Sequence, residues 1–117
     1  MVKTVGLGDV LKRKFSELKG VRYVLVYGSF AGGEEAGRSD VDLLVVGDVT
    51  EEEVITVVGR VEKEVGREIS YVLWSEGEFV KRVRNRHHLL TDIVSKPVIM
   101  IVGEEDEFRR SVKKQSH

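Results

Sequence analysis

Apolar residues follow two periods along the chain, one typical of amphipathic helices and one typical of buried strands. In residues 7–19 they recur at spacings of three and four, and Gly20 then ends the helix that this pattern predicts. Residues 21–27, VRYVLVY, are an unbroken run rich in β-branched and aromatic residues, which predicts a buried strand. The same two patterns predict interleaved helices and strands along the whole chain. The expected helices are residues 7–19, 51–65, 76–94 and 104–114, and the expected strands are residues 21–27, 41–46, 68–74 and 98–102.

Interleaved helices and strands predict an α/β (α+β) protein in which helices cover a small mixed β-sheet. The segment between the first two strands, residues 28–40, is glycine-rich and holds no full helix. A parallel crossover needs about a dozen residues or more, mostly helical. An antiparallel or mixed arrangement of these strands is therefore supported no less than a parallel one. The length of the chain fits a single domain, residues 1–117.

Two expected helices begin with a capping-box pattern, in which a hydroxyl residue precedes a glutamate by three positions. Thr50 with Glu53 would begin the helix at residues 51–65, and Ser75 with Glu78 would begin the helix at residues 76–94. Both patterns precede a run of apolar residues at helical spacing, which strengthens the assignment of the two helix starts.

Charge balance and the lack of cysteine limit the functions open to the chain. The 117 residues include 19 Lys and Arg and 20 Asp and Glu, for a formal net charge of −1. Generic nucleic-acid or membrane binders usually carry a basic excess, so charge does not indicate either partner. Without cysteine there are no disulfides and no thiolate metal sites. No apolar run approaches about 18 residues and the N-terminus lacks a secretory signal, so we expect a cytoplasmic protein.

Two further features of the sequence have interpretations that involve no specific function. Charged residues are abundant while Asn85 and Gln115 are the only side-chain amides, a composition typical of heat-adapted (thermophile-like) proteins. Residues 81–88, KRVRNRHH, form a basic stretch on an expected helix, and we interpret it as a solvated face. Contact of this stretch with phosphates or an acidic partner is the less favoured alternative.

Asp40 and Asp42 precede and begin an apolar strand, and they are the first candidates for chemistry. Two residues apart on a strand, they share one face with Cα atoms roughly 7 Å apart. At an effective dielectric constant of 20, their carboxylates repel by about 2 kcal/mol. Solvation, a basic neighbour such as Arg38, or a bound cation would offset this repulsion. Paired carboxylates suit Mg²⁺, which completes its octahedron with water and phosphate oxygens.

Gly28 and Ser29 directly follow the first strand and suggest a phosphate site. Glycine lets a ligand approach the backbone closely, and a helical turn starting at Ser29 would present free N–H groups and a hydroxyl. Taken alone, a Gly-Ser pair is common in turns and an Asp-x-Asp pair is often a solvated loop end. Their combination between two buried strands is more specific, because phosphate and metal sites side by side serve nucleotidyl transfer.

This combination resembles the minimal nucleotidyltransferases of the DNA polymerase beta superfamily. The matching residues occupy the Gly-Ser pair, the glycine-rich loop and the Ser-Asp-x-Asp pattern, namely Gly28, Ser29, Ala31, Gly33, Glu34, Ser39, Asp40, Val41, Asp42 and Leu43. The resemblance implies that Gly28 and Ser29 bind the phosphates of a nucleoside triphosphate. It implies that Asp40 and Asp42 are catalytic and hold Mg²⁺ or Mn²⁺. It also implies a small mixed sheet with helices packed mainly on one face.

Two positions depart from the family pattern. Gly32 stands where the loop arginine is common, which removes a phosphate contact. The third carboxylate of the family lies on the third strand, and the matching position in REISYVLW is Ser70. Glu68, two residues earlier on the same face, either replaces this carboxylate or is a solvated residue at the strand start, and we favour the second interpretation.

The resemblance and its departures lead to one main function and two alternatives. We expect nucleotide binding with Mg²⁺ and transfer of a nucleoside monophosphate to a hydroxyl, weakened or lost because Ser70 replaces a carboxylate. The first alternative is an inactive nucleotide-sensing or protein-interaction module with a regulatory or antitoxin-like role. The second is a scaffold without a nucleotide site. A homodimer or a partner protein is expected to complete the acceptor site.

Overall fold

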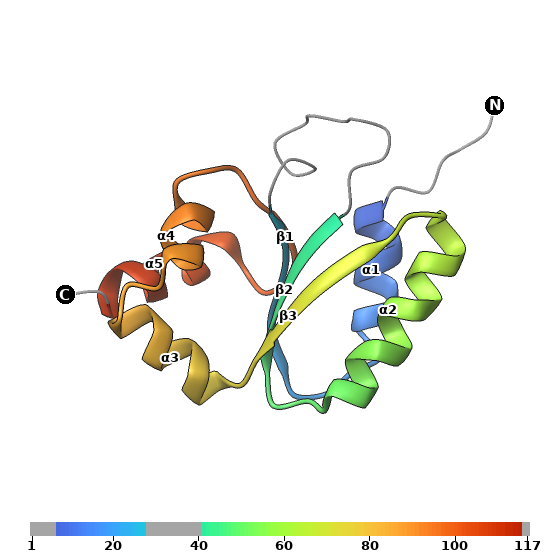
Figure 1. Cartoon of the computed structure of the whole chain (residues 1–117), viewed down its shortest axis with the longest axis horizontal. Helices are drawn as coiled ribbons and strands as arrows, with labels where there is room; N and C mark the ends of the chain where they lie inside the picture. The colour runs from blue at the N-terminus through green and yellow to red at the C-terminus, as the bar shows by residue number, and fades with distance from the viewer. Residues whose placement is uncertain (1–6, 28–40, 116–117) are drawn as a thin grey trace.

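The computed structural model describes residues 7–27 and 41–115, which form a four-stranded sheet flanked by helices (Figure 1). The expected residues Gly28, Ser29 and Asp40 lie outside the described part. The elements in chain order are α1 (Leu7–Phe15), β1 (Val21–Tyr27), β2 (Val41–Gly47), α2 (Glu51–Val65), β3 (Ile69–Trp74), α3 (Glu76–Arg84), α4 (His88–Val94), β4 (Ile99–Val102) and α5 (Glu105–Gln115).

The sheet is mixed, and its strand order is β3-β2-β1-β4. β1 is antiparallel to β2 and to β4, whereas β2 and β3 are parallel. The lengths of the links explain this difference. The link after β1 has only 13 residues, 28–40, which is near the minimum length for a parallel crossover, while the link between β2 and β3 contains the 15 residues of α2. The antiparallel arrangement of the first two strands, left open by the sequence, is therefore the observed one.

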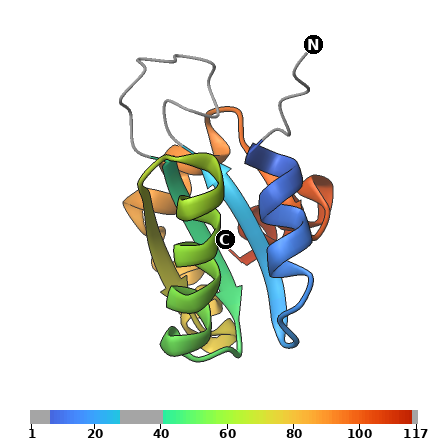
Figure 2. The same cartoon turned by 90° about the vertical axis from the view of Figure 1, so that its right-hand side faces the viewer.

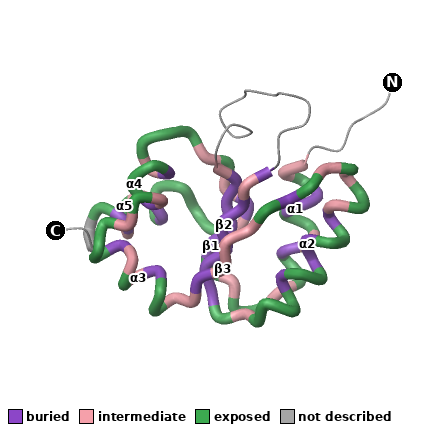
Figure 3. The backbone as a smooth tube through the Cα atoms, viewed as in Figure 1, coloured by how far each residue is buried: buried purple, intermediate pink, exposed green. Residues whose placement is uncertain are grey.

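Helices cover both faces of the sheet (Figures 1 and 2). One apolar cluster joins α1 and α2 to side chains such as Val24 and Leu43, and the other joins α3, α4 and α5 to side chains such as Leu25 and Leu44. β1 and β2 are buried on both sides, which explains why their residues form continuous apolar runs (Figure 3). The mixed sheet was expected, but the helices are not confined mainly to one face.

The helix expected at residues 76–94 is two helices. α3 ends with Asn85 as its C-cap, Arg86 has a positive φ of 53°, and α4 starts after His87. The Leu89 N–H donates to His87 Nδ1 at 3.1 Å, which caps the new helix. A continuous helix would place Arg86 and His87 on the inward face, three and four residues after Val83. Neither is apolar, so the apolar stripe of α3 does not continue through this point.

Other elements differ from the expectation only at their ends. α1 ends at Phe15 rather than residue 19, and residues 16–18 form turns. Strands and helices elsewhere start or end within one residue of the expected bounds. In the described ranges, no helix is both long and apolar enough to cross a membrane.

Both capping boxes are present as the sequence predicts. At α2, the Glu53 N–H donates to Thr50 Oγ1 at 3.1 Å and the Thr50 N–H donates to Glu53 Oε1 at 3.0 Å. At α3, the Glu78 N–H donates to Ser75 Oγ at 3.1 Å and the Ser75 N–H donates to Glu78 Oε1 at 3.0 Å. These bonds satisfy N–H groups that have no partner inside the helix.

Candidate functional site

Asp42 is the one expected site residue within the described ranges, and it is the second residue of β2. The chain leads into the undescribed segment from Tyr27, the last residue of β1, and returns at Val41, the first residue of β2. The Gly-Ser pair and Asp40 are therefore joined by peptide bonds to the end of the sheet at which Asp42 lies. This end is uppermost in Figure 1.

Asp42 lies between Tyr27 and Ser70 in a row across three strands. Asp42 is the register partner of Tyr27 on β1 and of Ser70 on β3. Register partners on neighbouring strands project to the same face of a sheet. That face is the one covered by α3, α4 and α5, since Tyr27 packs against the apolar cluster of those helices. We call these three residues the Asp42 row.

The Asp42 row is partly accessible and negatively charged. Ser70 is exposed, while Tyr27 and Asp42 are half-buried. Burial raises the pKa of Tyr27, and the charge of Asp42 raises it further. A negative charge at a partly buried row favours a cation there.

The donor chemistry of the row fits a hard divalent cation. Asp42 offers carboxylate oxygens and Ser70 a hydroxyl, and oxygen donors are what Mg²⁺ and Mn²⁺ prefer. The described residues alone do not form a complete site, because residues 7–27 and 41–115 contain no group of three His, Asp or Glu side chains able to hold a metal ion.

Ser70 occupies the place at which the resemblance expects a third carboxylate. The parallel register puts it beside Asp42, as the sequence pattern indicated. Glu68, the alternative carboxylate, precedes β3, and its carbonyl oxygen accepts a hydrogen bond from the Val41 N–H at 3.1 Å. Glu68 is exposed. Exposure at the strand entry is consistent with the interpretation of Glu68 as a solvated residue.

Tyr27 is the site residue that sequence analysis missed. Tyr27 is the last residue of an apolar strand, and its side chain packs against the apolar cluster of α3, α4 and α5. Its proximity to Asp42 depends on the register between β1 and β2, which the sequence does not state. The signal that could have identified it is its place directly before the Gly-Ser pair.

The basic stretch at the end of α3 packs partly against the core, at the opposite end of β3 from Ser70. The Arg82 guanidinium lies 4.9 Å from the centre of the Trp74 ring, and the His87 ring meets the same indole edge-on at 5.5 Å. Trp74 is only 5% exposed, so its role is packing. Burial lowers the pKa of His87, and His88 and Arg82 lower it further.

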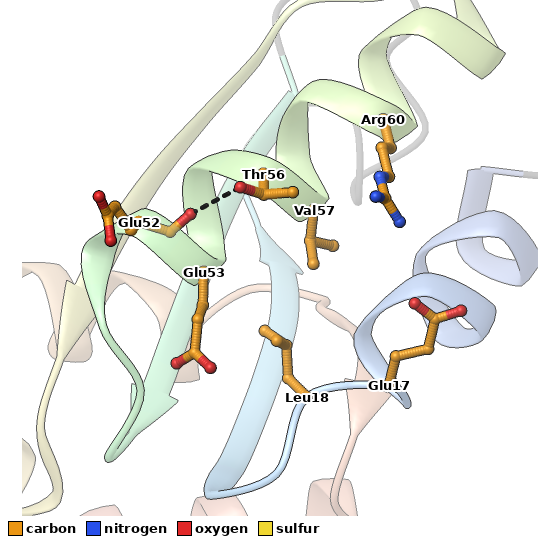
Figure 4. Close-up of a pocket in the computed structure, with 7 residues that line it drawn as sticks. All are labelled: Glu17, Leu18, Glu52, Glu53, Thr56, Val57 and Arg60. Carbon is orange, nitrogen blue, oxygen red and sulfur yellow. Dashed lines mark hydrogen bonds between the residues drawn. The ribbon is translucent and has the colours of Figure 1, made fainter.

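A hollow of about 430 Å³ lies between the end of α1 and the first turns of α2 (Figure 4). It is on the other face of the sheet from the Asp42 row, because α1 and α2 cover that face. Its wall combines glutamates and one arginine with apolar side chains. The lining residues are Glu17, Leu18, Glu52, Glu53, Thr56, Val57 and Arg60. The hollow is therefore separate from the candidate site.

The fold, with a carboxylate at the start of β2, fits a protein of the nucleotidyltransferase type. The profile of the family described as "Polymerase beta, Nucleotidyltransferase" matches residues 9–94, and the chain belongs to this family. It is 31% identical over 68 residues to "Putative protein adenylyltransferase MJ0604" of Methanocaldococcus jannaschii. That alignment covers 58% of this chain and 68% of the relative.

Solved structures with the same fold come from toxin–antitoxin complexes. One is a toxin–antitoxin structure with AMP-PNP, with a TM-score of 0.65 and 12% identity, covering 92% of this chain and 82% of that chain. Another contains tri-AMPylated Shewanella oneidensis HEPN toxin with MNT antitoxin, with a TM-score of 0.54 and 10% identity over 92% of this chain and 82% of that chain. At these identities the likeness shows the fold alone.

Proposed function

We propose that this chain binds a nucleoside triphosphate together with Mg²⁺ or Mn²⁺, and that it transfers the nucleoside monophosphate slowly to a hydroxyl of a protein. The observation that supports the proposal is the position of Asp42 beside Tyr27, the residue that precedes the Gly-Ser pair in the sequence, in a chain of the polymerase beta nucleotidyltransferase family. ATP is the first nucleotide to test, because the Methanocaldococcus relative is named an adenylyltransferase.

Each proposed site residue has a distinct task. Gly28 and Ser29 would bind the phosphates, with Ser29 supplying a hydroxyl and backbone N–H groups. Asp40 and Asp42 would hold the divalent cation, which when bound neutralises negative charge on the phosphates. Tyr27 would support Asp42 as its neighbour on β1, on the opposite side of Asp42 from Ser70.

The transfer step is a substitution at the α-phosphorus of the nucleotide. The acceptor hydroxyl oxygen forms a bond to this phosphorus while the bond to the bridging oxygen of the β-phosphate breaks. Pyrophosphate leaves, and the hydroxyl proton passes to solvent. Ser70 adds no negative charge beside Asp42, so we infer that nucleotide binding is retained while transfer is slow.

A second candidate function is supported by the same position. If transfer is absent, a chain that still binds nucleotide would act as a nucleotide sensor or a protein-interaction module. The neutral Ser70 next to Asp42 favours this candidate, since the alternative carboxylate, Glu68, lies exposed before the strand. In either case the acceptor or interaction partner would be another protein or a second copy of the chain.

Calorimetric titration of ATP tests the binding part of the proposal. We expect binding in the presence of Mg²⁺, loss of binding in metal-free buffer, and at least about tenfold weaker binding for Asp42→Asn. Asp48→Asn is the matched control, because Asp48 is an exposed residue just past the other end of β2. Equal affinities of these two variants, or absence of binding for ATP, GTP, CTP and UTP alike, would refute the proposed site.

Transfer is then measured with labelled nucleotide and candidate acceptor proteins. The sensor function predicts tight binding with no labelled protein product, for the wild type and for Ser70→Asp alike. The transferase function predicts a labelled product that increases in Ser70→Asp. The two functions therefore differ in the product and not in the binding isotherm.

A further inference from the structure

β3 forms one edge of the sheet, and within the described residues it pairs only with β2. Figure 1 shows it at the front of the molecule between α2 and α3. Its sequence, ISYVLW, contains no charged residue and no proline, and its pairing with β2 has no bulge. Natural edge strands usually carry such features to block pairing with another chain. β3 is therefore an open edge that favours the addition of a strand.

The hydrogen-bonding direction of β3 follows from one hydrogen bond between β2 and the residue that precedes β3. The Val41 N–H of β2 donates to the Glu68 carbonyl at 3.1 Å, so Glu68 faces β2. Peptide groups alternate in direction along a strand. Ile69, Tyr71 and Leu73 therefore direct their N–H and C=O groups away from β2, toward the open edge.

Glutamates occupy the outward N–H groups at both ends of this edge. The Ile69 N–H donates to Glu62 Oε2 at 2.8 Å, and beyond the strand the Ser75 N–H donates to Glu78 Oε1 at 3.0 Å. The open stretch lies between these two ends. Val72 is its midpoint, because it is three residues from each capped position.

We propose that a second copy of this chain pairs with β3 in antiparallel orientation, with a two-fold axis beside Val72. Tyr71 of one copy then lies opposite Leu73 of the other, and each such pair exchanges two main-chain hydrogen bonds. The two sheets become one continuous sheet through an isologous interface, in which both copies use the same surface.

The register follows from the symmetry of the edge. With the axis beside Val72, the capped N–H of Ile69 lies opposite the capped N–H of Ser75 of the other copy. With this axis, the open N–H and C=O groups of one copy pair with the open groups of the other. The ladder of hydrogen bonds then ends at the N–H groups that the glutamates cap. With the axis beside Tyr71 or Leu73, a capped N–H of one copy would lie opposite an open group of the other. That open group would then lack a hydrogen-bond partner.

An exposed apolar side chain lies on the same flank of the molecule. Ile55 of α2 is 53% exposed. Glu51 and Glu62, four residues before it and seven after it, both hydrogen-bond to residues of β3, so Ile55 lies on the side of α2 that borders the edge. Gly59, one turn further, has open space where a Cβ would be. A second copy added at β3 would cover this apolar surface.

A second copy fits the edge better than an unrelated strand. Any extended segment can use an open edge, and such a segment would need no symmetry in the open groups. The symmetric placement of the two capped N–H groups about Val72 matches a pair of chains related by a two-fold axis. The dimer does not depend on the proposed function. One consequence does: this register places Ser70 opposite Trp74 of the second copy, whose aromatic ring would then border the Asp42 row.

A cysteine at position 72 tests the register directly. Val72 lies opposite itself across the axis in a non-hydrogen-bonded pair, in which Cα atoms are about 4.5 Å apart. This separation permits a disulfide, and the chain has no other cysteine. We expect Val72→Cys to form a covalent dimer on mild oxidation. Ser70→Cys, shifted from the axis, and Ile99→Cys, on the opposite edge strand, should remain monomeric on denaturing gels.

Sedimentation of the reduced protein tests the interface without a cross-link. We expect wild-type chain to dimerise with a dissociation constant of roughly 1–100 μM, as for a small interface. Ile55→Lys should raise this constant at least about tenfold, because it places a charge in the interface. Ile99→Lys is the matched control, since Ile99 is the other exposed large apolar residue of the described ranges, at 37% exposure. It should leave the constant unchanged.

Each other outcome overturns the proposal. A wild-type chain that is monomeric throughout the concentration range would mean that the edge serves a different protein or none. A dimer that responds equally to Ile55→Lys and Ile99→Lys, or one that Val72→Cys does not capture while Ser70→Cys does, would place the interface or the register elsewhere.

Discussion

Replacing Ser70 with aspartate would place a second carboxylate beside Asp42, and its effect on stability can be worked out from the register. The two residues are partners on parallel strands, so their Cα atoms lie roughly 4.8 Å apart with side chains on one face. We therefore expect Ser70→Asp to destabilise the chain in metal-free buffer. We expect Mg²⁺ to reverse this effect, because a cation between two carboxylates removes their repulsion.

The size of the effect follows from the separation and the exposure of the two side chains. Two unit charges about 5 Å apart repel by ~3 kcal/mol at an effective dielectric constant of 20 and by ~1 kcal/mol in water. Since Ser70 is exposed and Asp42 half-buried, we expect about 1–2 kcal/mol. For a chain of this length, that lowers Tm by roughly 4–8 °C. Mg²⁺ at about ten times its dissociation constant would restore ~1.4 kcal/mol.

The assay is thermal unfolding of Ser70→Asp and Ser70→Asn, each in metal-free buffer and in Mg²⁺. Asparagine has the size of aspartate without its charge, so the difference between the variants isolates the repulsion. Equal Tm values in metal-free buffer would refute the placement of position 70 beside Asp42. A Tm difference that persists in saturating Mg²⁺ would refute the inference that a cation binds between the two side chains.

Four further predictions concern parts of the fold away from the site. Because the pKa of His87 is lowered in the folded chain, the unfolded chain binds a proton at His87 more readily than the folded chain does. The free energy of unfolding should therefore have its full value above about pH 6.5 and fall below that pH. Urea titrations at several pH values should show that His87→Gln reduces this fall. Ser75→Ala should cost about 1 kcal/mol by the same assay, since it removes the N-cap of α3. Gly103→Ala should cost about 2 kcal/mol or more, because φ is 92° and the new Cβ would lie 2.7 Å from the Tyr23 ring. By contrast, Gly59→Ala should stabilise a monomeric sample by about 0.5–1 kcal/mol, as its Cβ meets nothing.

The sequence predicted the strands and α2 well, because their signals are local. β1 and β2 are buried on both faces, so their residues form continuous apolar runs that need no knowledge of partners. The bounds of α2 follow from the Thr50 capping box at one end and Gly66, in the left-handed conformation, at the other. Signals of this kind are present in a few neighbouring residues.

The sequence did not predict features that depend on packing between distant segments. The break between α3 and α4 arises because Arg86 and His87 fall on the face that would have to be buried. The spread of helices over both faces is not visible in helical periodicity, which identifies an apolar side but not the sheet face that receives it. The shift of the helix end to Phe15 is a local fraying that apolar spacing does not detect.

The candidate site shows the same division. The pattern indicated that position 70 would lie near the aspartates, and the parallel register places Ser70 beside Asp42. Tyr27 could not be assigned in this way. Its place beside Asp42 depends on how the antiparallel strands align after the intervening segment, and a change of register by one residue would send its side chain to the other face.

Under the proposed function, nucleotide binding and nucleotide transfer use residues on different strands of the Asp42 row. Asp42 belongs to β2 and follows the Gly-Ser segment in the chain, so phosphate and cation binding would use residues from β1, β2 and their link. Position 70 belongs to β3, and a carboxylate there would add negative charge on the outer side of Asp42 only. Under the proposed function, loss of that charge would leave the binding residues intact and would remove an interaction that matters most in the transition state. Because β3 is also the open edge, a second copy that pairs there would place Trp74 opposite Ser70, on the side of the row where the charge is missing. Any group that compensates for the missing carboxylate at Ser70 would then have to come from Glu68, from the acceptor, or from the second copy. The Ser70→Asp variant places a carboxylate at this position, so its transfer rate distinguishes these cases from a row that needs no compensation.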